Sequence, residues 1–436
     1  MYVTGRFPLL VAVGVVPVVL LSAAGFSAWT VLGAWLLLVA AIVAVDLAAA
    51  PAPGTIRISR DVPARAKIGD VVPTRLQLIN TGERTVRARV RDAWQPTAGA
   101  PSERPRTAIP PRESRTLTVE LRPRRRGALR SEFVTLRVLG PLGFAGRQRS
   151  LTAPGTVRIL PPFRARRHLA SRVQRLRELD GSTSLQVRGQ GTEFDSLREY
   201  VRGDDVRSID WRATARSTST MLRTWRPERD RHVTILIDTG RTAAARVGDE
   251  TRLDAAFEAA MLLAALANRA GDHVHVLAYD RVVRARVTGV SGPRLLPEMS
   301  DALAPVEAQL IDTDWDHALG EARRLARRPS LVVILTAQES LSSSRDFLTR
   351  LQALPSASTT VLVGTVTDAA LNETARSDGS VTDLYRAASA EATVRDAEIV
   401  AHAMRRAGAE ALSDTPEGLP PRIADRYLAL KKAGKL

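Results

Sequence analysis

Oxygen-bearing side chains gather at the end of one strongly apolar segment of this 436-residue sequence. A buried strand followed by a loop is indicated by the run Leu236-Ile237-Asp238-Thr239-Gly240-Arg241-Thr242. The loop brings the carboxylate of Asp238 near the hydroxyls of Thr239 and Thr242. Oxygen ligands of this kind suit a hard divalent cation such as Mg²⁺. The alternative is structural, because Asp and Thr side chains also hold loops by bonding to nearby backbone groups.

The spacing of these residues resembles the metal-ion-dependent adhesion site of von Willebrand A domains, whose first segment is Asp-x-Ser-x-Ser. Asp238 and Thr242 match this segment, and Thr313 matches the threonine of the second segment. Gly240 stands where the resemblance implies a hydroxyl, and Ala337 stands where it implies an aspartate. The site is therefore degenerate, and we expect no cofactor. Mg²⁺ held by Asp238, Thr242 and Thr313 is the alternative.

The most distinctive part of the sequence is a polar stretch between residues 191 and 216. It includes Phe194-Asp195-Ser196-Leu197-Arg198-Glu199-Tyr200 and Gly203-Asp204-Asp205-Val206-Arg207-Ser208-Ile209-Asp210-Trp211, followed by Ala215-Arg216. These motifs resemble those of the bacterial family called domain of unknown function 58. The resemblance covers nearly the whole chain, including Gly140-Pro141-Leu142-Gly143-Phe144 and a tail with Asp425-Arg426-Tyr427.

Two interpretations of the polar stretch stay open. In the first, its carboxylates and arginines form bidentate ion pairs that hold an irregular segment against the following domain. In the second, the same side chains form a docking surface for a partner protein. Trp211 is expected to be a packed anchor rather than a platform for a ligand. The residues concerned are Arg198, Asp204, Asp205, Arg207, Asp210, Trp211, Arg212 and Arg216.

Common catalytic motifs are missing from the sequence. It contains no cysteine, no Gly-x-Ser-x-Gly elbow, no Walker A glycine loop and no His-Glu-x-x-His motif. His273 and His275 are two residues apart in a predicted strand and therefore face one side. Without cysteine or a third nearby histidine, they are expected to be ordinary strand residues rather than a metal pair. We expect that the protein is not an enzyme.

The first fifty residues are expected to form a transmembrane helical hairpin. No charged residue occurs from Phe7 to Val45, a run of 39 residues. Because a bilayer core needs about 20 residues per helix, the run fits two spans, near residues 7–24 and 28–46. A cleaved signal peptide is the alternative, but the apolar core of such a peptide is only about 7–15 residues long.

Positive charge is concentrated after the predicted hairpin. The chain has a formal net charge of +17, and residues 51–160 carry 22 Lys or Arg against 8 Asp or Glu. This excess favours a cytoplasmic position of the soluble region at the cell membrane, beside anionic lipid. Nucleic acid is not expected as a partner, because the arginines alternate with aliphatic residues and lack an aromatic stacking platform.

Three regions follow the predicted hairpin of residues 1–50. Residues 55–162 contain short alternating segments between turn residues, which predict the antiparallel strands of an immunoglobulin-like β-sandwich. Residues 163–230 are expected to connect the domains, with a helix over Ala165–Leu179 and the polar stretch. Strands and helices alternate over residues 231–436, which predicts a Rossmann-type α/β domain with a parallel sheet and a helical C-terminal tail. The adhesion-site resemblance implies that this domain is von Willebrand A-like.

The family resemblance also implies a partner and a role. Members of this family look like companions of AAA+ ATPases of the MoxR type, which implies a membrane-anchored, non-catalytic scaffold in protein complex assembly or maturation. Two other classes of protein stay open. One is a metal-assisted hydrolase that acts through Asp238, and the other is an extracellular adhesion-type binding protein, which requires the opposite topology.

Overall fold

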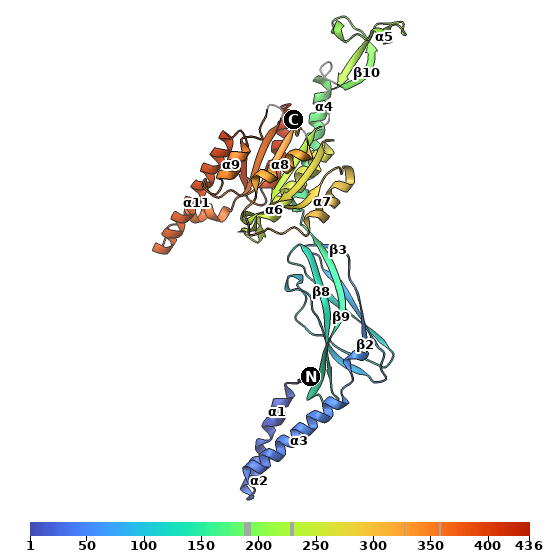
Figure 1. Cartoon of the computed structure of the whole chain (residues 1–436), viewed down its shortest axis with the longest axis vertical. Coiled ribbons are helices and arrows are strands. Elements are labelled where there is room, and N and C mark those ends of the chain that lie inside the picture. The colour runs from blue at the N-terminus through green and yellow to red at the C-terminus, as the bar shows by residue number, and fades with distance from the viewer. Residues whose placement is uncertain (187–192, 227–230, 327, 357–358) are drawn as a thin grey trace. The chain divides into compact units, whose positions relative to one another are not determined.

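The computed structural model describes residues 1–186, 193–226, 231–326, 328–356 and 359–436. These residues form two compact units, Met1–Leu160 and Pro161–Leu436. The first unit contains apolar helices and a β-sandwich, and the second contains a sheet flanked by helices (Figure 1).

Two apolar segments near the N-terminus are helical and long enough to cross a membrane. The first consists of α1 (Arg6–Val13) and α2 (Val15–Ala23), and the second is α3 (Ala28–Ala49). These bounds agree with the two predicted apolar spans, although the break between α1 and α2 was not predicted. At this break the helices approach closely, because a Cβ atom on Gly14 would lie 2.2 Å from the ring of Trp35.

The β-sandwich consists of two sheets. The larger has the strand order β1-β9-β8-β5-β6, with β3 beside β9, and the smaller has the order β2-β4-β7. The larger sheet contains β1 (Tyr2–Val3), β3 (Arg65–Lys67), β5 (Val86–Asp92), β6 (Arg106–Ile109), β8 (Gly127–Leu139) and β9 (Ala145–Leu160). The smaller contains β2 (Ile56–Asp61), β4 (Val72–Asn80) and β7 (Ser114–Leu121). The predicted immunoglobulin-like sandwich is confirmed, and β1 is an addition that the sequence did not indicate.

Alternation of apolar and polar residues explains why these strands form a sandwich. In β4, Leu76 and Leu78 are fully buried, whereas Arg75 and Gln77 beside them are exposed. Because side chains alternate between the faces of a strand, this pattern turns one face of each sheet toward the other. From β8, the opposite side of the core receives Val134, Leu136 and Val138.

A buried ion pair joins the two sheets. Arg60 of β2 binds Asp92 of β5 through hydrogen bonds of 2.7 and 3.0 Å, and the two side chains are 1% and 3% exposed. Asp92 also accepts hydrogen bonds from the indole of Trp94 (2.8 Å) and the hydroxyl of Ser131 (3.1 Å). The buried carboxylate is thus supplied with several donors, as a buried charge requires.

The end of α3 is bonded to the loop between β8 and β9. Asp46 is fully buried, although it lies in the last turn of a long apolar helix. A Cβ atom on Gly140 would lie 2.2 Å from its Oδ1 atom, so glycine lets the loop approach the carboxylate. Three backbone amides donate hydrogen bonds of 2.8 Å to Asp46, those of Leu142, Phe144 and Ala145. The helix and the sandwich therefore share one buried polar centre.

The second unit is built around a six-stranded sheet with the order β16-β15-β12-β17-β18-β19. The parallel strands are β12 (His232–Asp238), β15 (His273–Tyr279), β17 (Leu331–Leu335), β18 (Thr360–Val366) and β19 (Glu410–Asp414). The edge strand β16 (Val283–Val287) is antiparallel to β15. The prediction of a parallel sheet is wrong at this edge. The connection between the two strands is only a few residues long, and such a short connection forms a hairpin.

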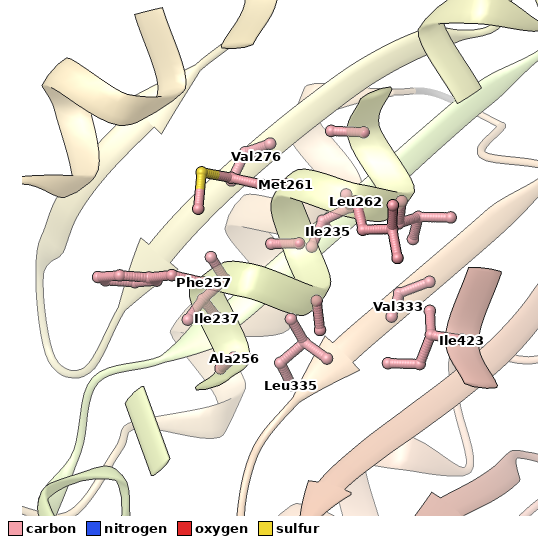
Figure 2. Close-up of a cluster of buried hydrophobic side chains, with 14 of the residues drawn as sticks. Ile235, Ile237, Ala256, Phe257, Met261, Leu262, Val276, Val333, Leu335 and Ile423 are labelled. Carbon is pink, nitrogen blue, oxygen red and sulfur yellow. The ribbon is translucent and has the colours of Figure 1, made fainter. Parts of the chain in front are cut away.

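Helices cover both faces of this sheet. One face carries α6 (Arg252–Arg269), α7 (Leu295–Leu303) and α12 (Leu419–Lys432). The other face carries α8 (Trp315–Leu325), α9 (Arg345–Leu351) and α11 (Val381–Arg406). Ile235 and Ile237 of β12 pack on the α6 face, near Phe257 and Met261 (Figure 2), whereas Leu236 packs on the opposite face. The remaining short elements are β13 (Arg246–Val247), β14 (Glu250–Thr251) and α10 (Ala369–Ala375).

The predicted helix over Ala165–Leu179 is present with shifted bounds. A 3₁₀ turn (Arg164–His168) precedes α4 (Leu169–Gln186). Ala165 and Leu176 lie in the same core as α6. Glu258 of α6 accepts hydrogen bonds from Arg164 Nε (2.9 Å) and from the backbone amide of Ala165 (2.8 Å). The start of the predicted connecting segment is therefore packed into the second unit.

Candidate functional site

Asp238 ends β12 and is 4% exposed. Its Oδ1 atom accepts hydrogen bonds from the backbone amide of Gly240 (2.8 Å) and the hydroxyl of Thr313. Its Oδ2 atom accepts a hydrogen bond of 2.6 Å from the hydroxyl of Thr336. Burial raises the pKa of Asp238, although these three donors act to lower it. Both carboxylate oxygens are therefore occupied by protein donors.

Gly240 is explained by the close approach of its neighbours. A Cβ atom there would lie 2.4 Å from the Thr313 hydroxyl and 3.0 Å from Asp238 Oδ1. The backbone of Gly240 is extended, with φ of −71°, so the requirement for glycine is space rather than an unusual conformation. The hydroxyl expected at this position from the adhesion-site resemblance has no room beside Thr313.

The structure brings together only two of the three predicted metal ligands. Asp238 and Thr313 are in contact, but among the described hydrogen bonds none joins Thr242 to Asp238. Ala337 is buried directly after β17 and supplies no carboxylate. Mg²⁺ prefers a near-octahedral shell of oxygen atoms. In the part of the chain that the structure describes, no group of three His, Cys, Asp or Glu side chains is placed to hold a metal ion. These residues do not fit a Mg²⁺ site.

A second buried carboxylate, Asp280, lies at the same edge of the sheet and was missed in the sequence. It follows β15 and has no exposed surface. It accepts hydrogen bonds from the Thr239 hydroxyl (2.9 Å), the Arg284 guanidinium (2.7 Å) and the backbone amide of Arg281 (2.6 Å). Burial acts to raise the pKa of Asp280, but these donors hold it below the usual value. Its position after the second strand was the signal that could have revealed it.

Three histidines form a stack near the N-terminal ends of β12 and β15, at the edge of the sheet opposite Asp238. The ring of His232 lies 5.2 Å from the rings of His273 and His275. Nδ1 of His232 and Nε2 of His275 are 2.9 Å apart, so a hydrogen bond joins these rings. Burial, followed by the neighbouring His232 and His273, lowers the pKa of His275. Stacked rings bonded to each other do not converge on a metal ion, and His232 is the third nearby histidine that sequence analysis overlooked.

The polar stretch forms a β-hairpin with an elaborated loop. Strands β10 (Glu193–Glu199) and β11 (Met221–Arg226) pair in antiparallel fashion. Arg198 binds Asp204 through two hydrogen bonds of 2.7 and 2.6 Å, and Asp204 also accepts from the amide of Val201 (3.0 Å). The hydrogen bond from Arg198 lowers the pKa of Asp204. The predicted bidentate ion pair is therefore present in this loop.

Asp210 organises the second half of the same loop. It caps the short helix α5 (Trp211–Thr214) by accepting hydrogen bonds from the backbone amides of Arg212 (2.9 Å) and Ala213 (3.0 Å). Its other oxygen binds Arg223 Nε at 2.7 Å. The Ala213 amide, followed by Arg223, lowers the pKa of Asp210. Arg223 lies outside the polar motif and was missed. Asp205 accepts from the backbone of Arg207 and caps the 3₁₀ turn Val206–Ser208.

Other expectations for this loop are wrong. Arg207, Arg212 and Arg216 were expected in ion pairs, but among the described residues none of them has an ion-pair partner, and all are exposed. Trp211 was expected to be packed, yet it is 69% exposed. The reason is that Asp210 fixes the single turn of α5 through backbone bonds, so the turn does not depend on a packed tryptophan.

Together these features define a multi-domain protein, in which two apolar helices, an immunoglobulin-like β-sandwich and a mixed α/β sheet follow one another. Residues 196–411 match the family described as "Protein of unknown function DUF58", and the chain belongs to this family. The match begins in β10 and ends in β19, so it includes the hairpin as well as Asp238. The resemblance inferred from the polar stretch is confirmed over residues 196–411, and its extension to nearly the whole chain stays a prediction.

Curated relatives are similar over a shorter part of the chain. Uncharacterised proteins of Mycobacterium tuberculosis and Mycobacterium bovis are 26% identical to it over 152 residues. This region is 34% of the chain and 48% of each relative. The chain therefore spans about half the length of the curated relatives it matches.

Solved structures overlap only with a small part of the chain. The CARDB domain of a Pyrococcus furiosus protein, in complex with di-metal ions, is 16% identical with a TM-score of 0.19, covering 24% of this chain and 87% of that chain. The complex of zinc 2-glycoprotein with prolactin inducible protein from human seminal plasma gives 9% identity and a TM-score of 0.19, covering 24% of this chain and 92% of that chain. Overlaps this low carry no argument about function.

Proposed function

We propose that this protein is a non-catalytic scaffold, anchored in the cell membrane by its two apolar helices, that docks a partner protein through the β10–β11 hairpin. The observation that carries the proposal is the exposure of Trp211 on a loop held by ion pairs. Exposure of the apolar tryptophan ring to water is unfavourable unless another surface covers it. Trp and Arg are also among the residues most enriched at the interface positions that contribute most of the binding free energy.

The loop of the hairpin exposes both apolar and cationic side chains. The exposed apolar residues are Trp211, which is 69% exposed, and Val201 and Val206, which are each 61% exposed. The exposed arginines without an ion-pair partner among the described residues are Arg202, Arg207, Arg212 and Arg216. A partner of matching chemistry presents an apolar pocket surrounded by carboxylates.

Ion pairs within the loop support the proposal by making the docking surface rigid. Arg198 with Asp204 and Arg223 with Asp210 hold the two halves of the loop. A surface fixed before binding loses less conformational entropy when the partner arrives. The arginines of both pairs are exposed, and ion pairs with an exposed partner contribute little to stability by themselves. We therefore propose that the two pairs serve to present Trp211.

Family resemblance supplies the identity of the proposed partner, an AAA+ ATPase of the MoxR type, and the proposed role in protein complex assembly or maturation. The α/β unit is proposed to be von Willebrand A-like, on the basis of its sheet order and of Asp238 at the end of β12. The excess of positive charge in residues 51–160 supports a cytoplasmic position of both units.

Co-purification tests the docking surface. The full chain is solubilised from membranes in a mild detergent, captured by a tag, and the recovered AAA+ ATPase is quantified by mass spectrometry. We expect Trp211→Ala to lower recovery and to weaken affinity by about 30-fold, the effect of losing roughly 2 kcal/mol at a central aromatic contact. The matched control is Tyr385→Ala on α11, because Tyr385 is also exposed, at 76%.

The possible results test the proposed ATPase partner and the proposed docking surface separately. Wild-type protein that recovers no MoxR-type ATPase would overturn the partnership. A Trp211→Ala protein that recovers as much ATPase as wild type, while Tyr385→Ala behaves identically, would overturn the docking surface. Thermal unfolding of both variants must match wild type, since both side chains are exposed.

The two alternative functions gain no support from the arrangement of the residues. A metal-assisted hydrolase needs a carboxylate free to bind metal or substrate, whereas both oxygens of Asp238 accept hydrogen bonds from the protein. An extracellular adhesion protein needs the units outside the cell. Protease treatment of intact spheroplasts decides this, because degradation of residues beyond the helices would favour adhesion over the cytoplasmic scaffold.

A further inference from the structure

The outer face of the larger sandwich sheet carries a row of arginines across neighbouring strands. Arg89 of β5 is directly opposite Arg106 of β6 on one side and Arg137 of β8 on the other. Arg137 is in turn opposite Gln148 of β9. Residues directly opposite in antiparallel strands lie on the same face. Arg89 lies between two buried core residues of β5, so the row faces away from the core.

These arginines lack negative partners within the part of the chain that the structure describes. Among the described residues, none forms an ion pair with Arg89, Arg106 or Arg137, although ion pairs occur elsewhere in the sandwich. Arg137 instead donates to the side-chain oxygen of Gln148 (2.7 Å) and lies 5.3 Å from the ring centre of Tyr2. Like charges directly opposite in a sheet are destabilising, so this row gains stability when an anion binds.

Two buried polar atoms beside the row have no hydrogen-bond partner among the residues that the structure describes. They are Nε of Arg89 and the hydroxyl of Tyr2. Burial raises the pKa of Tyr2, while the nearby Arg137 and Arg89 act to lower it. A neutral phenol and a guanidinium are both hydrogen-bond donors, and buried donors without acceptors are rare. Two donors without an acceptor beside a row of arginines therefore favour an anionic acceptor at this place.

The row lies next to the apolar helices. Tyr2 pairs with Gly146 of β9, and α1 begins a few residues later at Arg6. On the other side, Asp46 at the end of α3 binds the loop that follows β8. Arg137 is two residues, or about 7 Å, from the last residue of β8. The headgroup layer of a bilayer is on the order of 5–8 Å thick on each side, so the row reaches it if the helices span the membrane.

We propose that Arg89, Arg106, Arg137 and Tyr2 form a binding surface for the phosphate groups of anionic phospholipids in the membrane that holds the helices. This inference rests on the proposed membrane anchoring and is independent of the proposed docking of an ATPase. The guanidinium groups supply planar donors that match phosphate oxygens, and the ring of Tyr2 packs beside the Arg137 guanidinium. Lipid bound here fixes the depth and orientation of the sandwich at the bilayer surface.

The test uses the full chain in an uncharged detergent, titrated with short-chain phosphatidylglycerol or phosphatidylcholine, with the thermal unfolding midpoint as readout. Phosphatidylglycerol is expected to raise the midpoint and phosphatidylcholine is not. The variant Arg89→Gln/Arg137→Gln should bind phosphatidylglycerol about 25-fold more weakly, or roughly fivefold for each arginine removed near an anionic surface. Without lipid, its midpoint should equal or exceed that of wild type, because the facing charges are gone.

The matched control is Arg124→Gln/Arg125→Gln. It removes the same charge from the exposed loop before β8, a full 13-residue strand away. That strand is about 40 Å long, several Debye lengths at physiological salt, so this control should keep the wild-type response. A second variant, Arg89→Lys/Arg137→Lys, retains the charge and should keep most of the response.

Several results would contradict either the proposed lipid surface or the proposed membrane anchoring. A wild-type protein without a phosphatidylglycerol effect, or an Arg89→Gln/Arg137→Gln variant with an undiminished effect, would overturn the lipid surface. Equal stabilisation by inorganic phosphate would also overturn it, because the site would then take a soluble anion. Anchoring is tested separately by alkaline washing of membranes. A chain released by this washing contradicts the anchoring, whereas an anchored chain without a lipid response contradicts only this inference.

Discussion

The carboxylate of Asp46 and the backbone amide of Ala145 are joined by a hydrogen bond of 2.8 Å, although the residues are 99 positions apart. Asp46 ends an apolar helix and Ala145 begins β9, so this bond connects the helical segment directly to the sandwich. Because two further amides of the same loop bind Asp46, the carboxylate replaces the solvent that these buried groups would otherwise need.

Replacing Asp46 should therefore destabilise the first unit. Asp46→Ala leaves one buried and two partly buried amides without their acceptor, and we expect a loss of about 2–5 kcal/mol in the free energy of unfolding. Thermal unfolding of the full chain in detergent measures this loss. Asp61→Ala is the control, since its side chain is 77% exposed. Equal stability of the two variants would contradict the structural role of Asp46.

The buried pair of Arg60 and Asp92 should show a strong difference between single and double replacement. Asp92→Ala leaves an arginine with 1% exposure without its charge partner, and we expect a cost of about 3–5 kcal/mol. Arg60→Met combined with Asp92→Leu removes both charges and should cost less than either single change. Denaturant unfolding measures the three values. A double variant as unstable as the sum of the single ones would argue against a paired interaction.

Gly240→Ser should destabilise the second unit by about 1–3 kcal/mol, because the new side chain overlaps the Thr313 hydroxyl. Thr313→Ala removes this overlap, so the double variant should be more stable than the sum of the two single changes predicts. Thermal unfolding of all four proteins completes the cycle. The control is Gly320→Ser, because nothing lies within 4 Å of its Cβ position. Gly289→Ser is not suitable, because the backbone φ angle there is +69°, which strains any side chain.

Asp238 should give the second unit a specific pH dependence. Burial raises its pKa in the folded state, so the folded protein holds a proton more tightly than the unfolded chain. The free energy of unfolding therefore falls as pH rises from the unfolded pKa through the folded pKa, and is level above it. Asp238→Asn remains uncharged, so its stability relative to wild type should increase across this window. A pH series of thermal midpoints measures the effect, with the exposed Asp316→Asn as control.

An Asp238→Asn variant that differs from wild type by the same amount at every pH would contradict a raised pKa. The hydroxyl of Thr336 can rotate to accept from the new amide, so loss of folding is not the expected result.

Elements with strong periodicity could be predicted from the sequence. The segments 74–79 and 133–138 lie within β4 and β8, and the apolar run 232–237 lies within β12. In each of them, burial follows the residue pattern directly. Strand β1 could not be predicted, because two residues carry no period and their pairing depends on contacts with Ala145 and Gly146.

The candidate sites were predictable where residue type and position agree. Asp238 and Thr313 meet because each follows or precedes a regular element at the same edge of the sheet. The donor Thr336 was not identified, since a hydroxyl at the end of an apolar strand carries little signal of its own. Trp211 was misjudged because aromatic residues are usually buried, whereas the turn here is fixed by the Asp210 cap.

The β8–β9 hairpin gives the first unit a defined length. β9 runs from Ala145, beside the helices, to Leu160, where this unit ends. Its 16 residues extend about 50 Å at the usual rise of a strand. For a chain anchored in a bilayer, this hairpin holds the end of the first unit at a fixed distance from the lipid. Removing two residues from each of the two strands would bring that end closer to the lipid by about 7 Å.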